Sequence, residues 1–448
     1  MTKPRILLLT YTLNRLYYPM HVYIENIADY DGKKVLIKGW LHNKRSSGKV
    51  RFLLIRDGTG IVQSVIAKDE ADEKIFEIAD KITQESSLII TGMVRKDDRA
   101  PGGYEIIADS IEVLQMAIDY PISPKEHSID YLLPLRHLWL RSRKQNAIMR
   151  IRHHIIKALR DFFDDQGFIC ADTPILTPAA CEGTTTLFKV DYYDQEAYLS
   201  QSGQLYNEAA AAALGKVYCF GPTFRAEKSK TRKHLTEFWM LEPEVAFIEL
   251  DGIIDLAEDM IIYMIEKVLS KSKTELNTLK RDPSKLESIK KPFPRISYKE
   301  AVEIIKKKEP DFKYGDDFGA PHEAVIGEHF DQPVFIHHFP AAIKAFYMKR
   351  DPNDESLALG VDMIGPEGYG ELIGGGQRED DHDILLKRIK EYKLPEEAFQ
   401  WFLDLRKFGT CPHGGFGLGL ERTIAWICGI KHVRETIPFP RMLDKIYP

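Results

Sequence analysis

Features that mark several familiar protein classes are missing from this 448-residue sequence. It has only five cysteines, none at CxxC spacing, so we expect neither a disulfide framework nor a zinc site, and a reducing cytoplasm as its compartment. No apolar run approaches the roughly 20 residues that span a bilayer, so we expect no membrane insertion. Internal repeats and coiled-coil heptads are also missing, which excludes solenoids and long helical rods.

An excess of positive charge is absent too. The formal net charge is −5, which argues against a protein that coats nucleic acid indiscriminately but allows a local basic face. With 44% hydrophobic and 29% charged residues, the chain can bury large cores and is expected to form two or three domains.

Residues 1–19 superficially resemble a secretory leader, because basic residues precede an apolar run. The run is short, and no small-x-small cleavage site follows it before Met20. We therefore interpret Met20 as the natural start and residues 1–19 as an extension that is not native.

Residues 20–115 have the pattern of a small all-β barrel. Short β-branched runs alternate with Gly and Asp turns, and one helical stretch is expected over Asp69–Lys81. Five short strands with one helix are typical of the OB fold. The expected strands are Lys34–Trp40, Phe52–Arg56, Ile61–Ala67, Ser87–Val94 and Tyr104–Ala108.

This barrel is expected to carry a basic face. Eight Lys or Arg residues and no acid lie between Lys33 and Arg56, with Trp40 and Phe52 interleaved among them. The pattern suits a surface that follows a phosphate backbone while aromatic rings stack on bases. The alternative is that both rings belong to the barrel core and the lysines only solvate the surface. We favour nucleic-acid binding.

The rest of the chain divides into a linker and a larger domain. Residues 116–135 contain prolines among mixed charges and are interpreted as a linker before a domain over residues 136–448. Lys144–Gln166 has apolar residues at helical spacing and is followed by a glycine, which predicts a helix. Further amphipathic helices are expected between residues 250 and 315, where the sequence indicates no role beyond packing.

Residues 222–244 predict two strands joined by a cationic loop. Arg225 and Glu227 precede the loop, and Phe238, Glu242 and Glu244 lie on the returning strand. The carboxylates stand in an apolar segment, and buried acid needs a partner. A polyphosphate with a purine attached would suit the whole arrangement, whereas a solvated basic hairpin would not need the acids. The loop carries Lys228, Lys230, Arg232, Lys233 and His234.

Two glycine-rich segments are candidates to complete a phosphate site, because the sequence contains no P-loop. GFGLG at residues 415–419 allows close backbone approach, and Arg422 follows at the start of a predicted helix, where it could hold a terminal phosphate. In the other segment, residues 367–379, Glu371 stands beside a glycine run. An acid beside a phosphate-binding arginine is what a Mg²⁺-nucleotide site needs.

Two further segments suit a small polar ligand. Glu182 begins a flexible polar loop, and Gln204 lies in the sequence YLSQSGQLYN that follows it. Taken singly, each of these segments is as compatible with a structural role as with a functional one.

Three ordered motifs give the sequence a family resemblance. Residues 224–238, FRAEKSKTRKHLTEF, resemble motif 2 of the class II aminoacyl-tRNA synthetases, and residues 415–426, GFGLGLERTIAW, resemble motif 3. The predicted helix followed by DTPIL, with Pro174, resembles motif 1 at the dimer interface. Together with an N-terminal OB barrel, they resemble the aspartyl, asparaginyl and lysyl subgroup. The resemblance implies an α+β fold whose antiparallel catalytic sheet is flanked by helices, and a homodimer.

The resemblance also implies roles for individual residues, with ATP as substrate and Mg²⁺ as cofactor. Arg225, Glu371 and Arg422 would be catalytic, with Glu371 as the metal ligand. In the barrel, Phe52 and Gln63 would read an anticodon base. The implied ATP-binding residues are Arg225, Glu227, Lys233, His234, Leu235, Phe238, Glu371, Gly419 and Arg422. The implied amino-acid-binding residues are Glu182, Gln204, Arg225, Glu242 and Arg378.

Comparison within the subgroup favours asparagine as the amino acid and tRNA(Asn) as the partner. The aspartyl members have lysine where this chain has Asn207, and aspartate where it has Glu242. A carboxylate at 242 can accept from a carboxamide and repel a substrate carboxylate, and Arg378 can donate to the carboxamide oxygen. At Gly374 the archaeal-type aspartyl enzymes have serine, so a second metal contact is not expected there. The alternatives are an aspartyl enzyme, including one that accepts both tRNAs, and a paralogue that binds RNA or a metabolite without charging tRNA.

Overall fold

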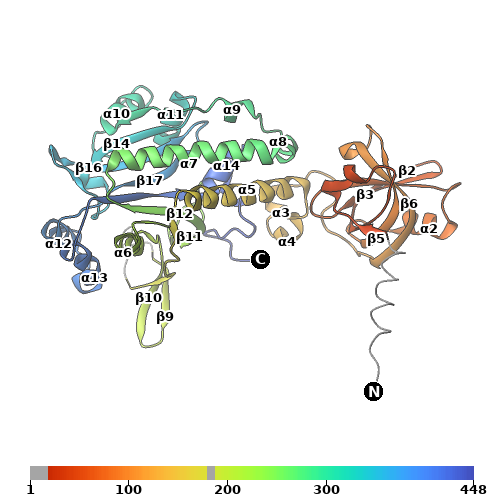
Figure 1. Ribbon diagram of the computed structural model, residues 1–448, viewed down its shortest axis with the longest axis horizontal. Coiled ribbons are helices and arrows are strands. Elements are labelled where there is room, and N and C mark those ends of the chain that lie inside the picture. The colour runs from red at the N-terminus through yellow and green to blue at the C-terminus, as the bar shows by residue number, and fades with distance from the viewer. Residues whose placement is uncertain (1–18, 179–186) are drawn as a thin grey trace, which may run out of the picture. The chain divides into compact units, whose positions relative to one another are not determined.

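The computed structural model describes residues 19–178 and 187–448, which form two compact units divided between Arg141 and Ser142 (Figure 1). Glu182 lies outside the described residues, as does nearly all of the segment 1–19. Among the described residues, no helix has the length and apolar character needed to cross a membrane.

The first unit is a closed β-barrel. Its sheet runs β1-β2-β3-β4-β6-β5, and β5 also pairs with β2, which closes the ring. The elements are β1 (Met20–His21), β2 (Lys34–Ser47), β3 (Val50–Arg56), β4 (Ile61–Ala67), α2 (Glu73–Lys81), β5 (Ser87–Lys96), β6 (Tyr104–Gln115), α3 (Ile129–Leu132) and α4 (Arg136–Trp139).

All five expected barrel strands are present, but two are much longer than predicted. Alternating burial in β2 ends at Leu41, whereas pairing with β3 continues to Ser47 opposite Val50. This outer part of the hairpin is held by its backbone ladder while its side chains stay in water, so hydrophobic alternation could not reveal it. Likewise, β6 continues to Gln115 because it pairs with β5 along its length.

The second unit is built on a mainly antiparallel sheet, in which nine strands of the described chain take part. The order is β13-β14-β16-β17-β18-β12-β11-β7, with β15 added to β16. The strands are β7 (Ile169–Cys170), β11 (Lys216–Phe224), β12 (Glu237–Ala246), β13 (Arg295–Ser297), β14 (Val334–Pro340), β15 (Arg350–Asp351), β16 (Asp354–Gly365), β17 (Gly370–Gln377) and β18 (His413–Gly419).

Helices and a small sheet surround this large sheet. A separate three-stranded sheet is formed by β8 (Leu176–Thr177), β9 (Lys189–Tyr192) and β10 (Gln195–Leu199). The helices are α5 (Arg143–Asp165), α6 (Gln204–Leu214), α7 (Leu250–Lys271), α8 (Lys273–Leu279), α9 (Ser284–Glu287), α10 (Tyr298–Lys306), α11 (Ala320–His329), α12 (His382–Glu391), α13 (Glu396–Lys407) and α14 (Leu420–Cys428).

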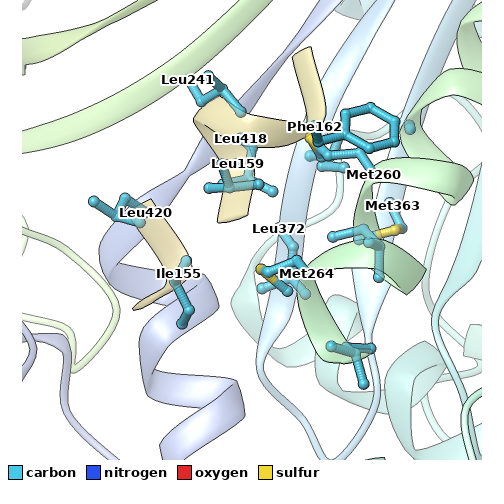
Figure 2. Close-up of a cluster of buried hydrophobic side chains, with 14 of the residues drawn as sticks. Ile155, Leu159, Phe162, Leu241, Met260, Met264, Met363, Leu372, Leu418 and Leu420 are labelled. Carbon is cyan, nitrogen blue, oxygen red and sulfur yellow. The ribbon is translucent and has the colours of Figure 1, made fainter. Parts of the chain in front are cut away.

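Helices α5 and α7 bury one face of the large sheet (Figure 1). The predicted helix over 144–166 is α5, and its apolar stripe meets that of α7 and the inner face of the sheet. Figure 2 shows side chains of both helices converging with side chains from β12, β16, β17 and β18 and from the start of α14. The labelled residues are Ile155, Leu159, Phe162, Leu241, Met260, Met264, Met363, Leu372, Leu418 and Leu420.

Close packing between β12 and β18 yields a prediction about Gly415. A Cβ added there would lie 2.0 Å from the carbonyl oxygen of Pro243, in the neighbouring strand. We expect Gly415→Ala to lower the free energy of unfolding by about 1–3 kcal/mol, because backbone atoms must separate to admit the methyl group. Urea unfolding followed by circular dichroism measures this.

The matched control is Gly221→Ala, in β11 of the same sheet, where an added Cβ meets nothing within 4 Å. Its free energy of unfolding should stay close to that of the wild type. Equal losses in the two variants would contradict the packing argument.

Candidate active site

Strands β11 and β12 form the predicted hairpin with its cationic loop. They pair from Lys216 opposite Val245 to Phe224 opposite Glu237. Directly after β11, the backbone N–H of Arg225 donates to the carbonyl of Thr236 at 3.0 Å, so the loop is closed at its base. Arg225 is therefore held where the rigid sheet ends and the basic loop begins.

Strand β12 separates the core from the candidate site. Leu241 and Val245 point into the core beneath the helices, whereas Glu242 and Glu244 point to the other face. Both carboxylates are nevertheless buried, with only 4% and 1% of the residue exposed. The expectation that these acids are buried on the return strand is confirmed.

Strand β18 gives this face a glycine floor, which we define as Gly415, Gly417 and Gly419. Gly415 lies opposite Glu244 in the ladder, and Gly419 lies opposite Met240. A Cβ at Gly417 would approach the terminal methyl of Met240 to 2.4 Å, so a side chain there would fill the space above the sheet. The floor therefore leaves backbone accessible to a ligand.

The nine predicted ATP-binding residues line a single cavity above this floor. They come from the hairpin, β17, β18 and the start of α14, which the fold brings together from distant parts of the sequence. The guanidinium of Arg225 lies 5.5 Å from the ring centroid of Phe238, which places positive charge beside an aromatic face. A nucleotide needs both, the positive charge for its phosphates and the aromatic face for its base.

Two basic side chains of the loop, Lys233 and His234, have surroundings that suit a bound anion. Burial, together with the charge of Arg422, lowers the pKa of both Lys233 and His234. The Lys233 ammonium lies 4.0 Å from the carboxylate of Glu323 on α11. A bound polyanion would favour the protonated forms of both residues and would offset the repulsion from Arg422.

Helix α14 is anchored so that Arg422 reaches into the cavity. Glu421 accepts from Arg152 Nη1 at 2.7 Å and from the backbone N–H of Trp239 at 2.9 Å. Arg422 Nη1 donates to the carbonyl oxygen of Glu371 at 2.5 Å. The helix that the sequence predicted around Arg422 is therefore present as α14.

Glu371 has a second carboxylate near it, from Asp362 on β16. A Cβ on Gly374 would lie 2.6 Å from Glu371 Oε1 and 3.6 Å from Asp362 Oδ1, so the two acids converge at that glycine. Burial and the charge of Asp362 raise the pKa of Glu371 to about 7. Lys344 Nζ pairs with Asp362 Oδ2 at 2.7 Å. Two converging carboxylates in a buried place have the donor set that Mg²⁺ prefers.

Sequence reasoning missed Asp362 and Lys344. Asp362 is a single acid in the apolar strand sequence LALGVDMIG, the same signal that identified Glu242 and Glu244. Applied to β16, that signal would have found it. Lys344 follows a strand without any local pattern, and only the folded chain brings it to Asp362.

A second cavity adjoins the first and shares Arg225, Met240, Glu371 and Gly417 with it. Four of the five predicted amino-acid-binding residues line it, namely Gln204, Arg225, Glu242 and Arg378. The fifth, Glu182, lies outside the described residues.

Glu242 is held by donors from α6, from the turn before it and from β11. Its carboxylate accepts from the hydroxyl of Ser202, from the backbone N–H of Gly203 at 2.9 Å and from the thiol of Cys219 at 3.4 Å. Asn207 is fully buried, and its amide donates to the carbonyl oxygen of Glu242 at 2.8 Å. Asn207 therefore ties α6 to strand β12.

Arg378 follows β17 and is fixed by Glu244. Its Nε and Nη2 donate to the two carboxylate oxygens at 3.0 and 2.9 Å, and both side chains are almost fully buried. The remaining terminal nitrogen, Nη1, lies 3.7 Å from Met348 Sδ beside the second cavity. Bidentate pairing leaves Arg378 with one defined direction in which to donate.

The two predicted anticodon-reading residues lie in the barrel, joined by Arg45. The Arg45 guanidinium lies 4.3 Å from the ring centroid of Phe52, and its Nη2 donates to Gln63 Oε1 at 3.2 Å. Gln63 is only 6% exposed, and its Nε2 donates to Glu105 at 3.0 Å. The structure thus brings the two residues together, with a cation over the aromatic face.

Comparison with known proteins gives these features a common context. Residues 128–443 match the family of class II tRNA synthetases (D, K and N), and residues 35–114 match the OB-fold nucleic acid binding domain. The Asparagine--tRNA ligase of Pelotomaculum thermopropionicum is 59% identical over 427 residues, which cover 95% of this chain and 99% of that protein.

Solved structures agree in fold. The asparaginyl-tRNA synthetase of Pyrococcus horikoshii complexed with asparaginyl-adenylate superposes with a TM-score of 0.92 at 47% identity, covering 95% of this chain and 99% of that one. The aspartyl tRNA synthetase of Entamoeba histolytica gives 0.81 at 28% identity, covering 96% of this chain and 93% of that one. The chain therefore belongs to the class II tRNA synthetases of the D, K and N group.

Proposed function

We propose that this protein is an asparagine–tRNA ligase, which activates asparagine with ATP and transfers it to tRNA(Asn). The observation that carries the proposal is the meeting of the two cavities at Arg225 and Glu371. One cavity has the charge and aromatic face for ATP, and the other has an acceptor and a donor for a carboxamide. High identity to asparagine–tRNA ligases along nearly the whole chain supports it.

The proposed nucleotide contacts follow from the side chains at the first cavity. Phe238 stacks on adenine, and Glu227 accepts from its amino group. Arg225 bridges the α-phosphate and the amino-acid carboxylate, because it lines both cavities. Lys233, His234 and Arg422 hold the outer phosphates. Leu235 and Gly419 complete the wall and the floor.

The reaction needs no general base in its first step. The α-carboxylate of asparagine, with a pKa of roughly 3.5, is already an anion and attacks the α-phosphorus directly. Diphosphate leaves, and asparaginyl-adenylate remains. Arg225 aligns the reactants and offsets the negative charge that develops on the α-phosphate. The terminal ribose hydroxyl of tRNA then attacks the acyl carbon, its proton is released, and AMP leaves.

Mg²⁺ fits the site as cofactor, because Glu371 and Asp362 converge in a buried place where the charge of Asp362 disfavours ionisation of Glu371. These two residues would hold the ion, which would supply positive charge to the phosphates of ATP. The Lys344 ammonium, paired with Asp362, supplies part of that charge from the protein itself.

Selection of asparagine over aspartate is assigned to Glu242 and Arg378. Glu242 accepts from the carboxamide NH₂ and would repel a carboxylate at the same position. Arg378 Nη1 donates to the carboxamide oxygen, since its other two donor nitrogens face Glu244. Gln204 and Glu182 are assigned to the α-ammonium end of the substrate.

The remaining assignments concern the tRNA and the assembly. We assign residues 20–115 to anticodon binding, with Phe52 stacking on a base and Gln63 hydrogen bonding to it. We assign residues 116–135, within which α3 lies, to the linker and residues 136–448 to the catalytic domain, although the chain up to Arg141 belongs to the first compact unit. We further propose a homodimer through the segment that contains Pro174, and a cytoplasmic location.

The amino-acid preference is tested by ATP–diphosphate exchange with asparagine and aspartate in parallel. We expect exchange with asparagine, because Glu242 and Arg378 together match a carboxamide. Exchange with aspartate alone would favour the aspartyl alternative, and exchange with neither would favour a paralogue that does not charge tRNA.

Arg225 provides a test of the adenylation step. Arg225→Ala should lower the exchange rate by about 10²–10³-fold, because it removes the donor that stabilises the α-phosphate in the transition state. Arg232→Ala, an exposed arginine of the same loop, is the control and should keep most of the activity. If both variants lose activity equally, the assignment of Arg225 is wrong.

Metal binding at Glu371 should depend on pH. Its pKa of about 7 means that, without metal, the carboxyl group loses its proton between about pH 6 and 8, and only the carboxylate binds a cation. We therefore expect Mn²⁺ affinity, measured by electron paramagnetic resonance, to increase across this range. Glu371→Gln should weaken binding at every pH and remove most of the increase. An unchanged affinity in this variant would exclude Glu371 as a ligand.

A further inference from the structure

A carboxylate that none of the proposed contacts uses is buried behind the second cavity. Glu208 lies on α6, one turn after Gln204, and its side chain is 0% exposed. Arg406 of α13 pairs with it through Nη2, and His413 of β18 through Nε2 at 3.0 Å. Removing these charged groups from water costs free energy, which the ion pairs offset only in part.

The contacts of His413 define its protonation state. Its Nδ1 lies 2.8 Å from the carbonyl oxygen of Cys411, which can only accept a hydrogen bond. Its Nε2 faces the carboxylate of Glu208, which also accepts when ionised. Arg406 Nη2, which can only donate, lies farther from the same Nε2, at 3.5 Å, so the nearer carboxylate decides. Both ring nitrogens then carry protons, and His413 is an imidazolium.

Charge at this position agrees with the hydrogen bonds. Burial favours neutral forms of both groups, but Arg406 and His413 outweigh it and keep the pKa of Glu208 below its usual value. For His413, burial is outweighed by the hydrogen bond and charge of Glu208, which raise its pKa. Two other charged groups lie close to His413. Arg406 Nη2 is 3.5 Å from His413 Nε2, and its charge lowers the pKa of His413. The charge of Glu244 on β12 raises that pKa, and the counter-charge of Glu244 is Arg378.

Two carboxylates and one imidazole could be interpreted as a metal site here. One ligand atom from each of Glu208, Glu244 and His413 lies within 4.8 Å of the others. The guanidiniums of Arg406 and Arg378 already supply the positive charge that these carboxylates require. The cluster is therefore closed by the protein's own cations.

Gln204 connects this cluster to the second cavity. Its Nε2 donates to Glu208, which as an acceptor-only group forces the amide nitrogen of Gln204 toward it. The carbonyl oxygen of the same amide must then point the opposite way, and Gln204 lines the second cavity. Without Glu208, nothing in that contact would distinguish the two ends of the amide.

We propose that Glu208, which touches no substrate, is a positioning residue that turns the Gln204 oxygen toward the donors of the amino acid, and that the His413 imidazolium keeps Glu208 in place. The proposal rests on the proposed function, because it assigns a role within the amino-acid pocket. It also predicts pH dependence: above the pKa of His413, Nε2 and Glu208 become two facing acceptors, the contact fails and asparagine binds more weakly.

The first experiment compares KM for asparagine and for ATP in diphosphate exchange. Glu208→Gln should raise KM for asparagine by about tenfold to a hundredfold, the effect of losing one hydrogen bond that involves a charge, and leave KM for ATP nearly unchanged. The matched control is Glu275→Gln in α8, which removes a buried carboxylate that pairs with Arg150 at 2.8 Å. That variant should keep both values.

A reciprocal variant separates positioning from a purely structural role. In Gln204→Glu/Glu208→Gln, the new amide at 208 donates to the new carboxylate at 204, whose second oxygen still accepts from the substrate. KM for asparagine should recover by at least half of the loss on a logarithmic scale. A structural defect at 208 would instead be worsened by the second change.

The pH profile needs only the wild type and His413→Gln. KM for asparagine in the wild type should rise above the pKa of His413, whereas the variant should show a flat and higher KM over the same range. Unchanged KM in Glu208→Gln, or equal profiles for wild type and His413→Gln, would overturn this inference while leaving the proposed function intact. No exchange with asparagine in the wild type would overturn the proposed function itself.

Discussion

The guanidinium of Arg378 and the carboxylate of Glu244 form an ion pair that is almost completely buried. Removing either partner would leave the other charge buried and uncompensated, at a cost of about 3–5 kcal/mol. The pair ties the end of β17 to β12, so it fixes the strand that carries Glu371 relative to the hairpin that carries Arg225. Strands β12, β17 and β18 line both cavities, and β18 with its glycine floor lies between the other two.

The sequence predicted the parts of the site that have local patterns. Strand β12 was recognisable because two acids interrupt an apolar run at alternate positions, and the structure buries them on the face opposite the core. The order and spacing of the three motifs then identified the family, which the comparisons confirm. Assignments of single residues to ATP or asparagine stay predictions, although the structure gathers all but Glu182, Phe52 and Gln63 around two adjoining cavities.

Non-local partners could not be predicted. Nothing near Lys344 in the sequence indicates that it pairs with Asp362, and nothing near Glu208 indicates His413 or Arg406. Strand ends were missed for a related reason, because β2 continues as a solvent-exposed ladder after its hydrophobic alternation stops. In the barrel, Arg45 on Phe52 and Glu105 on Gln63 are also cross-strand contacts, which depend on register rather than on composition.

The glycine floor constrains how such an enzyme can change. A Cβ at Gly415 would lie 2.0 Å from a backbone oxygen of the neighbouring strand, whereas a Cβ at Gly417 would meet the flexible end of Met240. Gly415 therefore has almost no freedom to vary while the sheet stays intact. Backbone groups of the floor are the same whatever ligand lies above them, and they offer no means of telling one amino acid from another. If this scaffold acquired a new amino-acid substrate, the substitutions would therefore fall in β12, α6 and the segment after β17. The glycine floor would be retained.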